Sequence, residues 1–388
     1  MKVALQIAAT FGGAGLGHVC YQAARGLRDA AMLARVTCAG HQKTDIDEGL
    51  ISDVAGLDFP SRVIPRRLYN RLGVDPLLRQ NYFGWLASRN LRGCDAAHGY
   101  TGQMVETIAA ARRLGIRTVV DRPNTHVRFM ERLLDAEYRK YGVPFQPYTR
   151  SQVLRETREL QECDAVVTCS DLAKQTMVDE GVDETKIHVA RYGVDFETFH
   201  PEPRQDETFR VVFAGLICLR KGVQYLLDAW EKLRLDQAEL VMQGHLLDDA
   251  VAVVRHYLPR CRFTILPHSA DPAQLCRLYN SASVCVFPSV EDGFGMVVSE
   301  AMACNKPVII TSNMGAADIV VSGLDGLVLP PANAEAIKEA LLQFYETPGS
   351  AMGQNNRERV AALTWDAYRA SLMSVYAGLA SQEEGGNA

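Results

Sequence analysis

The chain has 388 residues, of which 47% are hydrophobic and 22% charged, and its formal net charge is −5. At roughly 150 residues per domain, this length predicts two or three domains, and the composition excludes a disordered or fibrous chain. No apolar run approaches the ~18 residues of a membrane-spanning helix, and the short apolar amino-terminal stretch is typical of a first strand, not of a signal peptide. The ten cysteines lack CxxC spacing and mostly adjoin apolar runs, so we expect free thiols in a reducing cytoplasm, neither disulfides nor zinc ligands.

The first half of the chain alternates short apolar or β-branched runs with segments of helical periodicity. We predict strands at 3–9, 35–38, 96–98, 118–121, 165–168 and 187–190. We predict helices at 18–30, 103–114, 151–162 and 171–179. This alternation indicates βαβ units and a parallel sheet.

A polar segment with two prolines, 200–206, predicts a linker, and the alternation resumes after it. Strands are predicted at 209–215, 239–242, 262–266, 284–287, 307–311 and 326–329, and helices at 223–233, 248–257, 272–280, 295–303 and 334–347. The fold is therefore expected to be α/β, with two Rossmann-like doubly wound domains at 1–205 and 206–363 and a helix at 364–380 that packs back on the first domain. Such sheets bind ligands beyond the carboxyl ends of their strands, so we expect the site in a central cleft.

A glycine-rich loop, 12–17, follows the first predicted strand and precedes a helix. Backbone N–H groups of Gly12 and Gly13 can approach a phosphate in such a loop. The dinucleotide pattern G-x-G-x-x-G fails because His18 stands at its third glycine, and no acid ends the second strand to hold a ribose. No nicotinamide cofactor is therefore expected. The alternative to a phosphate-binding loop at 12–17 is a plain strand-to-helix turn that contacts no ligand.

A basic segment with interleaved aromatic and apolar residues lies between positions 61 and 92, where only Asp75 opposes the arginines. Its members are Arg62, Arg66, Arg67, Arg71, Arg79, Arg89 and Arg92. A basic residue contributes about 1 kcal/mol near an anionic membrane surface, so the segment Arg62–Arg92 predicts peripheral contact with the inner face of a membrane. A pair of solvated helices is the alternative. Nucleic acid is not an expected partner, because the chain is acidic and lacks a recognised binding motif.

An acidic constellation follows the strand predicted at 284–287. Gly293 and Gly295 open a turn, and the helix that begins there offers free N–H groups and a dipole that favour a diphosphate. Glu300, roughly a turn and a half into this helix, can accept hydrogen bonds from the vicinal hydroxyls of a ribose. Asp292, before the turn, is expected to point a second carboxylate at the cleft.

This segment resembles the E-x7-E region of the large retaining glycosyltransferase family 4, with the GT-B fold, usually written E-G-F-G…E-A-M-A. Further matching landmarks are Gly13, Tyr192-Gly193-Val194-Asp195, Gly215, Lys221-Gly222, Lys306-Pro307-Val308-Ile309, Gly315 and Asp325-Gly326. The resemblance implies transfer of a hexose-type sugar, with retention, from a UDP- or GDP-sugar donor to a glycan or lipid-linked acceptor, in polysaccharide or glycoconjugate biosynthesis.

Three positions depart from the family pattern. The first acid is Asp292, a shorter carboxylate, while Glu291 is one residue out of register and is expected to point elsewhere. Leu216 replaces an arginine that contacts the diphosphate in similar proteins, and Arg220 is expected to compensate. The asparagine of the linker motif is Tyr192, which should matter little.

The resemblance also implies the roles of single residues. We expect catalytic roles for Lys221 on the leaving diphosphate, Asp292 on the sugar, and His126 beside the reacting carbon; a buried structural role is the alternative for His126. The residues expected to bind substrate are Gly12, Gly13, Arg122, Gly215, Arg220, Gly293, Phe294, Gly295, Met296, Val297 and Glu300. No cofactor is expected. No metal ion is expected either, because metal-dependent transferases typically hold the ion with an Asp-x-Asp triplet in the donor site, and the one such triplet here, at 45–47, lies in a polar loop of the first half.

Two alternatives to a transferase remain open at this point. A non-catalytic, nucleotide-sugar-binding relative is favoured by the two changes at Leu216 and Asp292. A sugar-nucleotide epimerase is possible within the same GT-B fold. Release of nucleoside diphosphate and analysis of the products would separate these classes.

Overall fold

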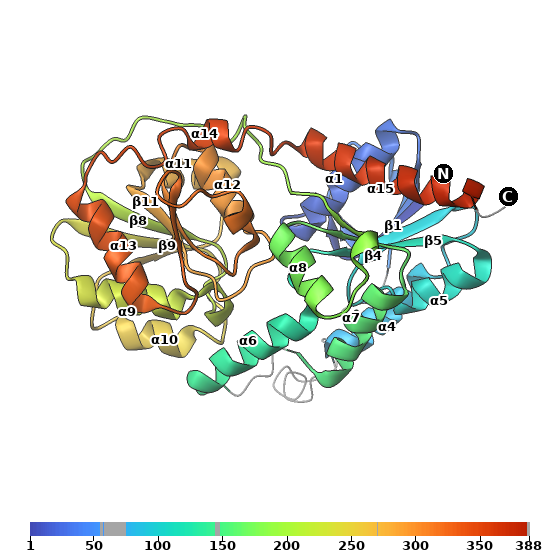
Figure 1. Cartoon of the computed structure of the whole chain (residues 1–388), viewed down its shortest axis with the longest axis horizontal. Helices are drawn as coiled ribbons and strands as arrows, with labels where there is room; N and C mark the ends of the chain where they lie inside the picture. Colours follow the sequence, from blue (N-terminus) through green and yellow to red (C-terminus); the bar gives the residue numbers. More distant parts are fainter. Residues whose placement is uncertain (55–56, 58–74, 144–147, 270, 386–388) are drawn as a thin grey trace.

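The computed structural model describes residues 1–54, 57, 75–143, 148–269 and 271–385, and Figure 1 shows them in two lobes. Four arginines of the basic segment lie outside the described residues: Arg62, Arg66, Arg67 and Arg71. Within the described ranges, none of the helices is both long enough and apolar enough to cross a membrane.

The first lobe is built on a parallel sheet. In the described part of this lobe, seven strands pair in the order β3-β2-β1-β4-β5-β6-β7. They are β1 Val3–Phe11, β2 Leu33–His41, β3 Ile51–Asp53, β4 Ala96–Tyr100, β5 Arg117–Arg122, β6 Ala165–Thr168 and β7 Ile187–Val189. β4 and β6 are buried along their whole length, as expected of parallel strands covered on both faces. The order reverses between β1 and β4, so a cleft is expected beyond the carboxyl ends of these two strands.

The connections of the first lobe are mostly helical. Its helices are α1 Leu16–Asp29, η1 Glu48–Leu50, α4 Asp75–Ala87, α5 Val105–Leu114, α6 Val127–Lys140, α7 Arg150–Glu162, α8 Asp171–Asp179 and η2 Glu184–Lys186. α6 extends toward the second lobe (Figure 1), where Tyr138 donates a hydrogen bond to Asp249 at 2.6 Å. Gln224 and Tyr225 of the second lobe donate to Glu137 of the same helix, each at 2.8 Å.

The second lobe repeats the architecture with a smaller sheet. The six strands that the structure describes there pair in the order β10-β9-β8-β11-β12-β13, all in parallel. They are β8 Phe209–Ala214, β9 Ala238–Gln243, β10 Thr264–Leu266, β11 Val284–Phe287, β12 Val308–Thr311 and β13 Gly326–Leu329. Its helices are η3 Leu219–Lys221, α9 Val223–Leu233, α10 Val251–Tyr257, α11 Pro272–Ser281, α12 Met296–Ala303, η4 Gly315–Asp318, α13 Ala334–Glu346 and α14 Asn356–Arg359. The predicted α/β class with two Rossmann-like sheets is confirmed.

The last helix, α15 Trp365–Gly385, leaves the second lobe and runs beside α1 on the first lobe (Figure 1). Tyr368, Leu372 and Tyr376 recur every four residues on one face and are buried in the first lobe's core. The Tyr376 hydroxyl lies 2.6 Å from Nδ1 of the buried His98 on β4. This helix ties the end of the described chain to the lobe where the chain begins.

Candidate active site

The turn between β11 and α12 presents a helix start to the space between the lobes. Gly295, the residue before α12, has a φ of 85°, a left-handed conformation that favours glycine. A Cβ there would lie 2.7 Å from Cε of Met314. Among the described residues no side chain caps the helix, so its first N–H groups are free for a ligand.

A cavity of about 400 Å³ lies against this helix start, and both lobes line it. The first lobe contributes Gly15, Leu16, Pro123 and Asn124, among others. The structure brings eight predicted site residues to the cavity: Gly215, Arg220, Lys221, Asp292, Phe294, Gly295, Met296 and Val297. Leu216, at the position of the family's arginine, also lines it and is 39% exposed.

Two cations on the second-lobe wall of the cavity are each paired with a carboxylate. Lys221 forms an ion pair with Asp292, and Arg220 pairs with Glu291 at 3.1 Å. Burial by itself would raise the pKa of Asp292, but Lys221 and Arg220 outweigh that effect and hold the pKa below its usual value. Asp292 is therefore ionised at neutral pH, with Lys221 beside it.

Glu291 turns away from the cavity, as its register predicts, and bonds to the other lobe. Its Oε1 accepts hydrogen bonds from the backbone N–H and from Oγ1 of Thr125, at 3.2 and 2.8 Å. The side chain is fully buried. The sequence gives no sign of this contact, because Thr125 stands 166 positions earlier in the chain.

The backbones of the two lobes approach each other closely at Gly293. A Cβ on Gly293 would lie 2.0 Å from the carbonyl oxygen of Pro123 and 2.5 Å from Cα of Asn124, so only glycine fits this approach. Ser170 of the first lobe donates a hydrogen bond to the carbonyl oxygen of Gly293 at 2.6 Å. Gly293 therefore packs between the lobes, although it was predicted as a substrate-binding residue, and it is not among the residues that line the cavity.

Glu300 lies on α12 behind the cavity wall. It is half-buried and accepts a hydrogen bond from the Tyr279 hydroxyl at 3.2 Å. Burial raises the pKa of Glu300 to about 7, and the Tyr279 hydrogen bond opposes this only in part. It does not line the described cavity, so its contact with a ribose stays a prediction.

His126 and Arg122 stabilise the loop after β5 and do not line the cavity. The buried His126 precedes α6, and its Nδ1 accepts from the N–H of Arg128 at 3.3 Å, while its Nε2 has no partner among the described residues. Burial, aided by the charge of Arg122, lowers the pKa of His126 to about 4, so its ring is neutral. Arg122 pairs with Glu156 and donates to the Thr125 carbonyl at 2.9 and 2.7 Å. Their substrate contacts stay predictions.

The first-lobe residues that reach the cavity differ from those chosen from the sequence. Gly15 and Leu16 line it, whereas Gly12 and Gly13 of the same loop do not. Asn124 lines it from the loop of His126. Asn124 was not among the predicted site residues, and its place after a strand and beside Pro123 is the sequence signal that could have identified it.

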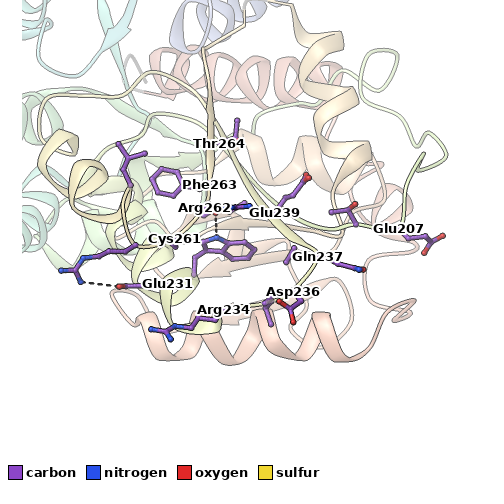
Figure 2. Close-up of a pocket in the computed structure, with 17 residues that line it drawn as sticks. Glu207, Glu231, Arg234, Asp236, Gln237, Glu239, Cys261, Arg262, Phe263 and Thr264 are labelled. Carbon is purple, nitrogen blue, oxygen red and sulfur yellow. Dashed lines mark hydrogen bonds and ion pairs between the residues drawn. The ribbon is translucent and has the colours of Figure 1, made fainter.

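A larger cavity, of about 1010 Å³, lies at the other end of the second sheet, where β9 and β10 begin. Figure 2 shows its lining, with Glu207, Glu231 and Glu239 among the labelled side chains. Trp230 closes one side by donating its indole N–H to the Arg262 carbonyl at 2.8 Å. Because β9 and β10 begin here, this cavity faces away from the carboxyl ends of the strands, where ligands of such sheets bind.

Two facing Rossmann-like domains, with cations and a free helix start in the cleft between them, define the GT-B class of fold. A family model described as Glycosyltransferase Family 4 matches residues 13–198, and one described as Glycosyl transferases group 1 matches residues 195–360. The chain belongs to the family 4-like glycosyltransferases of the GT-B fold.

Curated relatives carry several names within this family. The chain is 28% identical over 256 residues to a D-inositol 3-phosphate glycosyltransferase of Xylanimonas cellulosilytica, a match covering 60% of this chain and 61% of that one. It is 26% identical over 247 residues to the capsular polysaccharide biosynthesis glycosyltransferase CapM of Staphylococcus aureus, covering 57% and 63%. The chain thus matches about three fifths of the length of these relatives.

Solved structures share the fold over nearly the whole chain. A sucrose-phosphate synthase from Thermosynechococcus elongatus superposes with a TM-score of 0.73 at 21% identity, covering 98% of this chain and all of that one. The Anabaena protein HepE in complex with UDP-glucose superposes with a TM-score of 0.71 at 16% identity, with 98% and 100% coverage. These similarities establish the GT-B fold.

Proposed function

We propose that the chain is a retaining glycosyltransferase that moves a hexose-type sugar from a UDP- or GDP-sugar to a glycan or lipid-linked acceptor. The observation that carries the proposal is the meeting of Lys221, Arg220 and the uncapped start of α12 at the interdomain cavity. Fixed cations and aligned N–H groups suit a leaving nucleoside diphosphate, because its negative charge grows as the sugar–phosphate bond breaks. No metal ion takes part in this proposal.

In the proposed reaction, the bond between the anomeric carbon and the diphosphate oxygen breaks while the acceptor oxygen bonds to the same face of that carbon. The acceptor proton passes to the departing phosphate oxygen. Among the described lining residues Asp292 is the one carboxylate, and Lys221 is paired with it. This supports the front-side route, because a double displacement uses two carboxyl groups ~5–5.5 Å apart.

Each side chain of the site is proposed to contact a different part of the nucleotide-sugar donor. We propose that the diphosphate shares the Lys221 ammonium with Asp292, which leaves an Asp292 oxygen to accept a hydrogen bond from a sugar hydroxyl. Arg220, held by Glu291 at 3.1 Å, supplies the charge that Leu216 cannot supply. Glu300 binds the ribose. For His126 to contact the sugar, its loop must turn, because the ring now caps α6.

The relatives support the donor and acceptor classes. The HepE structure contains UDP-glucose, which supports a UDP-sugar donor. The CapM name refers to capsular polysaccharide biosynthesis, which supports a glycan or lipid-linked acceptor. We therefore propose a role in the assembly of a polysaccharide or glycoconjugate.

We further propose that the enzyme acts in the cytoplasm, against the inner face of the membrane. Leu78, Tyr82 and Trp85 recur at helical spacing on α4 and are 47%, 42% and 45% exposed. The Arg89 guanidinium lies 3.6 Å from the centre of a Trp85 ring. Aromatic and basic side chains together favour the interface of an anionic bilayer, where a lipid-linked acceptor would be found.

Incubation with a panel of UDP-, GDP- and ADP-sugars tests the proposal. A transferase releases nucleoside diphosphate in the presence of acceptor, and added Mg²⁺ leaves the rate unchanged. A sugar-nucleotide epimerase yields a sugar with altered configuration, and a non-catalytic relative binds the donor without turnover. The epimerase result and the result of binding without turnover would each contradict transferase activity.

A further inference from the structure

Three side chains with metal-binding atoms converge at the edge of the first sheet. Cys38 and His41 belong to β2, and Asp53 is the last residue of β3. The Cys38 Sγ lies 3.2 Å from Oδ1 of Asp53, and Nδ1 of His41 lies 2.9 Å from the same oxygen. One ligand atom from each residue lies within 4.8 Å of the other two. The proposed transferase chemistry uses none of these residues.

The spacing suits a small tetrahedral ion. Zinc bonds of ~2.3 Å to sulfur and ~2.0–2.1 Å to nitrogen or oxygen hold neighbouring ligand atoms about 3.3–3.6 Å apart. The two separations at Asp53 are shorter than this by a few tenths of an ångström, and the third, between Cys38 and His41, is within 4.8 Å, so the side chains must move to bring all three atoms to an ion. The exposed Asp53 and partly exposed His41 can make that movement while the buried Cys38 stays in place.

The donor set points to zinc among the common metals. A thiolate and an imidazole favour Zn²⁺ over Mg²⁺ or Ca²⁺, which prefer oxygen ligands. Three protein ligands leave a fourth position open, on the side where His41 and Asp53 meet solvent. We propose that Cys38, His41 and Asp53 form a zinc site, and that binding releases the Cys38 thiol proton while His41 binds as neutral imidazole. This would revise the sequence-based expectation that no cysteine is a zinc ligand.

A zinc ion at this site would link the edge strand β3 to the part of β2 that contacts the glycine-rich loop at 12–17. β3 has three residues and pairs with β2 at Val36, Thr37 and Cys38. Directly after His41, the N–H of Gln42 donates to the Phe11 carbonyl at 2.9 Å. The neighbouring Gly12 packs on Thr44, whose Cγ2 would lie 2.7 Å from an added Cβ. A metal bond across β2 and β3 therefore restrains the start of the glycine-rich loop as well as the edge strand.

Cobalt and zinc titration of the purified full chain tests the site. Cobalt should give a thiolate-to-metal charge-transfer band at about one ion per chain, and zinc should displace it. Cys38→Ser should abolish the band, and His41→Ala and Asp53→Asn, which remove direct ligands, should weaken binding by at least the roughly 10–100-fold that the loss of an outer-shell partner costs. Zinc should also raise the thermal midpoint of the wild type and not that of Cys38→Ser.

Two variants serve as matched controls. Cys261→Ser removes another thiol, and His268→Ala disrupts an exposed pair of imidazoles, His245 and His268, whose ring centres lie 4.6 Å apart. Both should keep the cobalt band. The proposal is overturned if the wild type shows no band, if Cys38→Ser keeps it, or if His268→Ala loses it.

Discussion

The carboxylate of Glu291 joins the two domains by accepting two hydrogen bonds from Thr125, at 3.2 Å from the backbone N–H and 2.8 Å from Oγ1. Its second oxygen pairs with Arg220 at 3.1 Å. One buried side chain therefore both connects the domains and positions a cation of the cavity. The domain contact and the donor site are linked through it.

Glu291→Ala should destabilise the protein by about 2–3 kcal/mol, because it leaves Arg220 and the Thr125 N–H without their acceptor. Thr125→Val removes only the hydroxyl hydrogen bond and should cost about 1 kcal/mol. Urea unfolding measures both. Glu207→Ala, at an exposed acid, should stay within about 0.5 kcal/mol of wild type. Equal free energies of unfolding for Glu291→Ala and Glu207→Ala would show that the contacts of Glu291 with Thr125 and Arg220 do not stabilise the protein.

Lys221→Ala should lower kcat by roughly 100–1,000-fold, because the leaving diphosphate loses a fixed positive charge. Nucleoside diphosphate release at saturating donor measures the effect. Lys232→Ala is the matched control, since Lys232 is an exposed lysine paired with Asp228 on α9. A Lys221 variant that turns over like the Lys232 variant would remove Lys221 from the site.

Donor affinity should rise with pH through the range of the Glu300 pKa, about 7. The ribose hydroxyls donate to the carboxylate, so a proton on Glu300 competes with the donor; below the pKa affinity rises with pH, and above it affinity levels off. Calorimetric titration with UDP-glucose between about pH 5.5 and 8.5 measures the slope. Glu300→Gln should bind more weakly and with no such slope. A slope that persists in Glu300→Gln would assign the titration to another group.

Trp85→Ser should weaken binding to phosphatidylglycerol vesicles by roughly tenfold, because the exposed ring provides apolar area that enters the bilayer interface. Vesicle sedimentation measures the partition. Leu258→Ser is the matched control, since Leu258 is 57% exposed but lies on the second domain. Comparable losses in both variants, or no binding by the wild type, would contradict the proposed membrane contact.

The sequence predicts the parts of the site that are local in the chain. A strand, a glycine turn and a helix within 284–303 place Asp292 and the start of α12 at the cavity, and each step follows from neighbouring residues. Contacts between the domains need the three-dimensional arrangement. The Glu291–Thr125 hydrogen bonds and the packing of Gly293 on Pro123 therefore could not be predicted.

The helix α6 shows a second limit. Its buried residues Val127, Met130, Leu134 and Tyr138 share one helical face, yet the sequence analysis predicted no helix there. Its other faces are strongly charged, and the apolar face packs on the second domain beside Tyr225, not under its own sheet. Because His126 ends the loop before this helix, missing α6 also hid that the ring serves as its cap.

Product analysis after incubation with UDP-glucose, UDP-galactose and GDP-mannose, in the presence of lipid-linked acceptors, tests the central claim most directly. We predict release of nucleoside diphosphate together with a glycoside whose anomeric configuration, read by NMR, matches that of the donor. Lys221→Ala should lower the rate of both signals by the same roughly 100–1,000-fold as its kcat. Inverted configuration would contradict the retaining mechanism, and donor binding without product would contradict transferase activity.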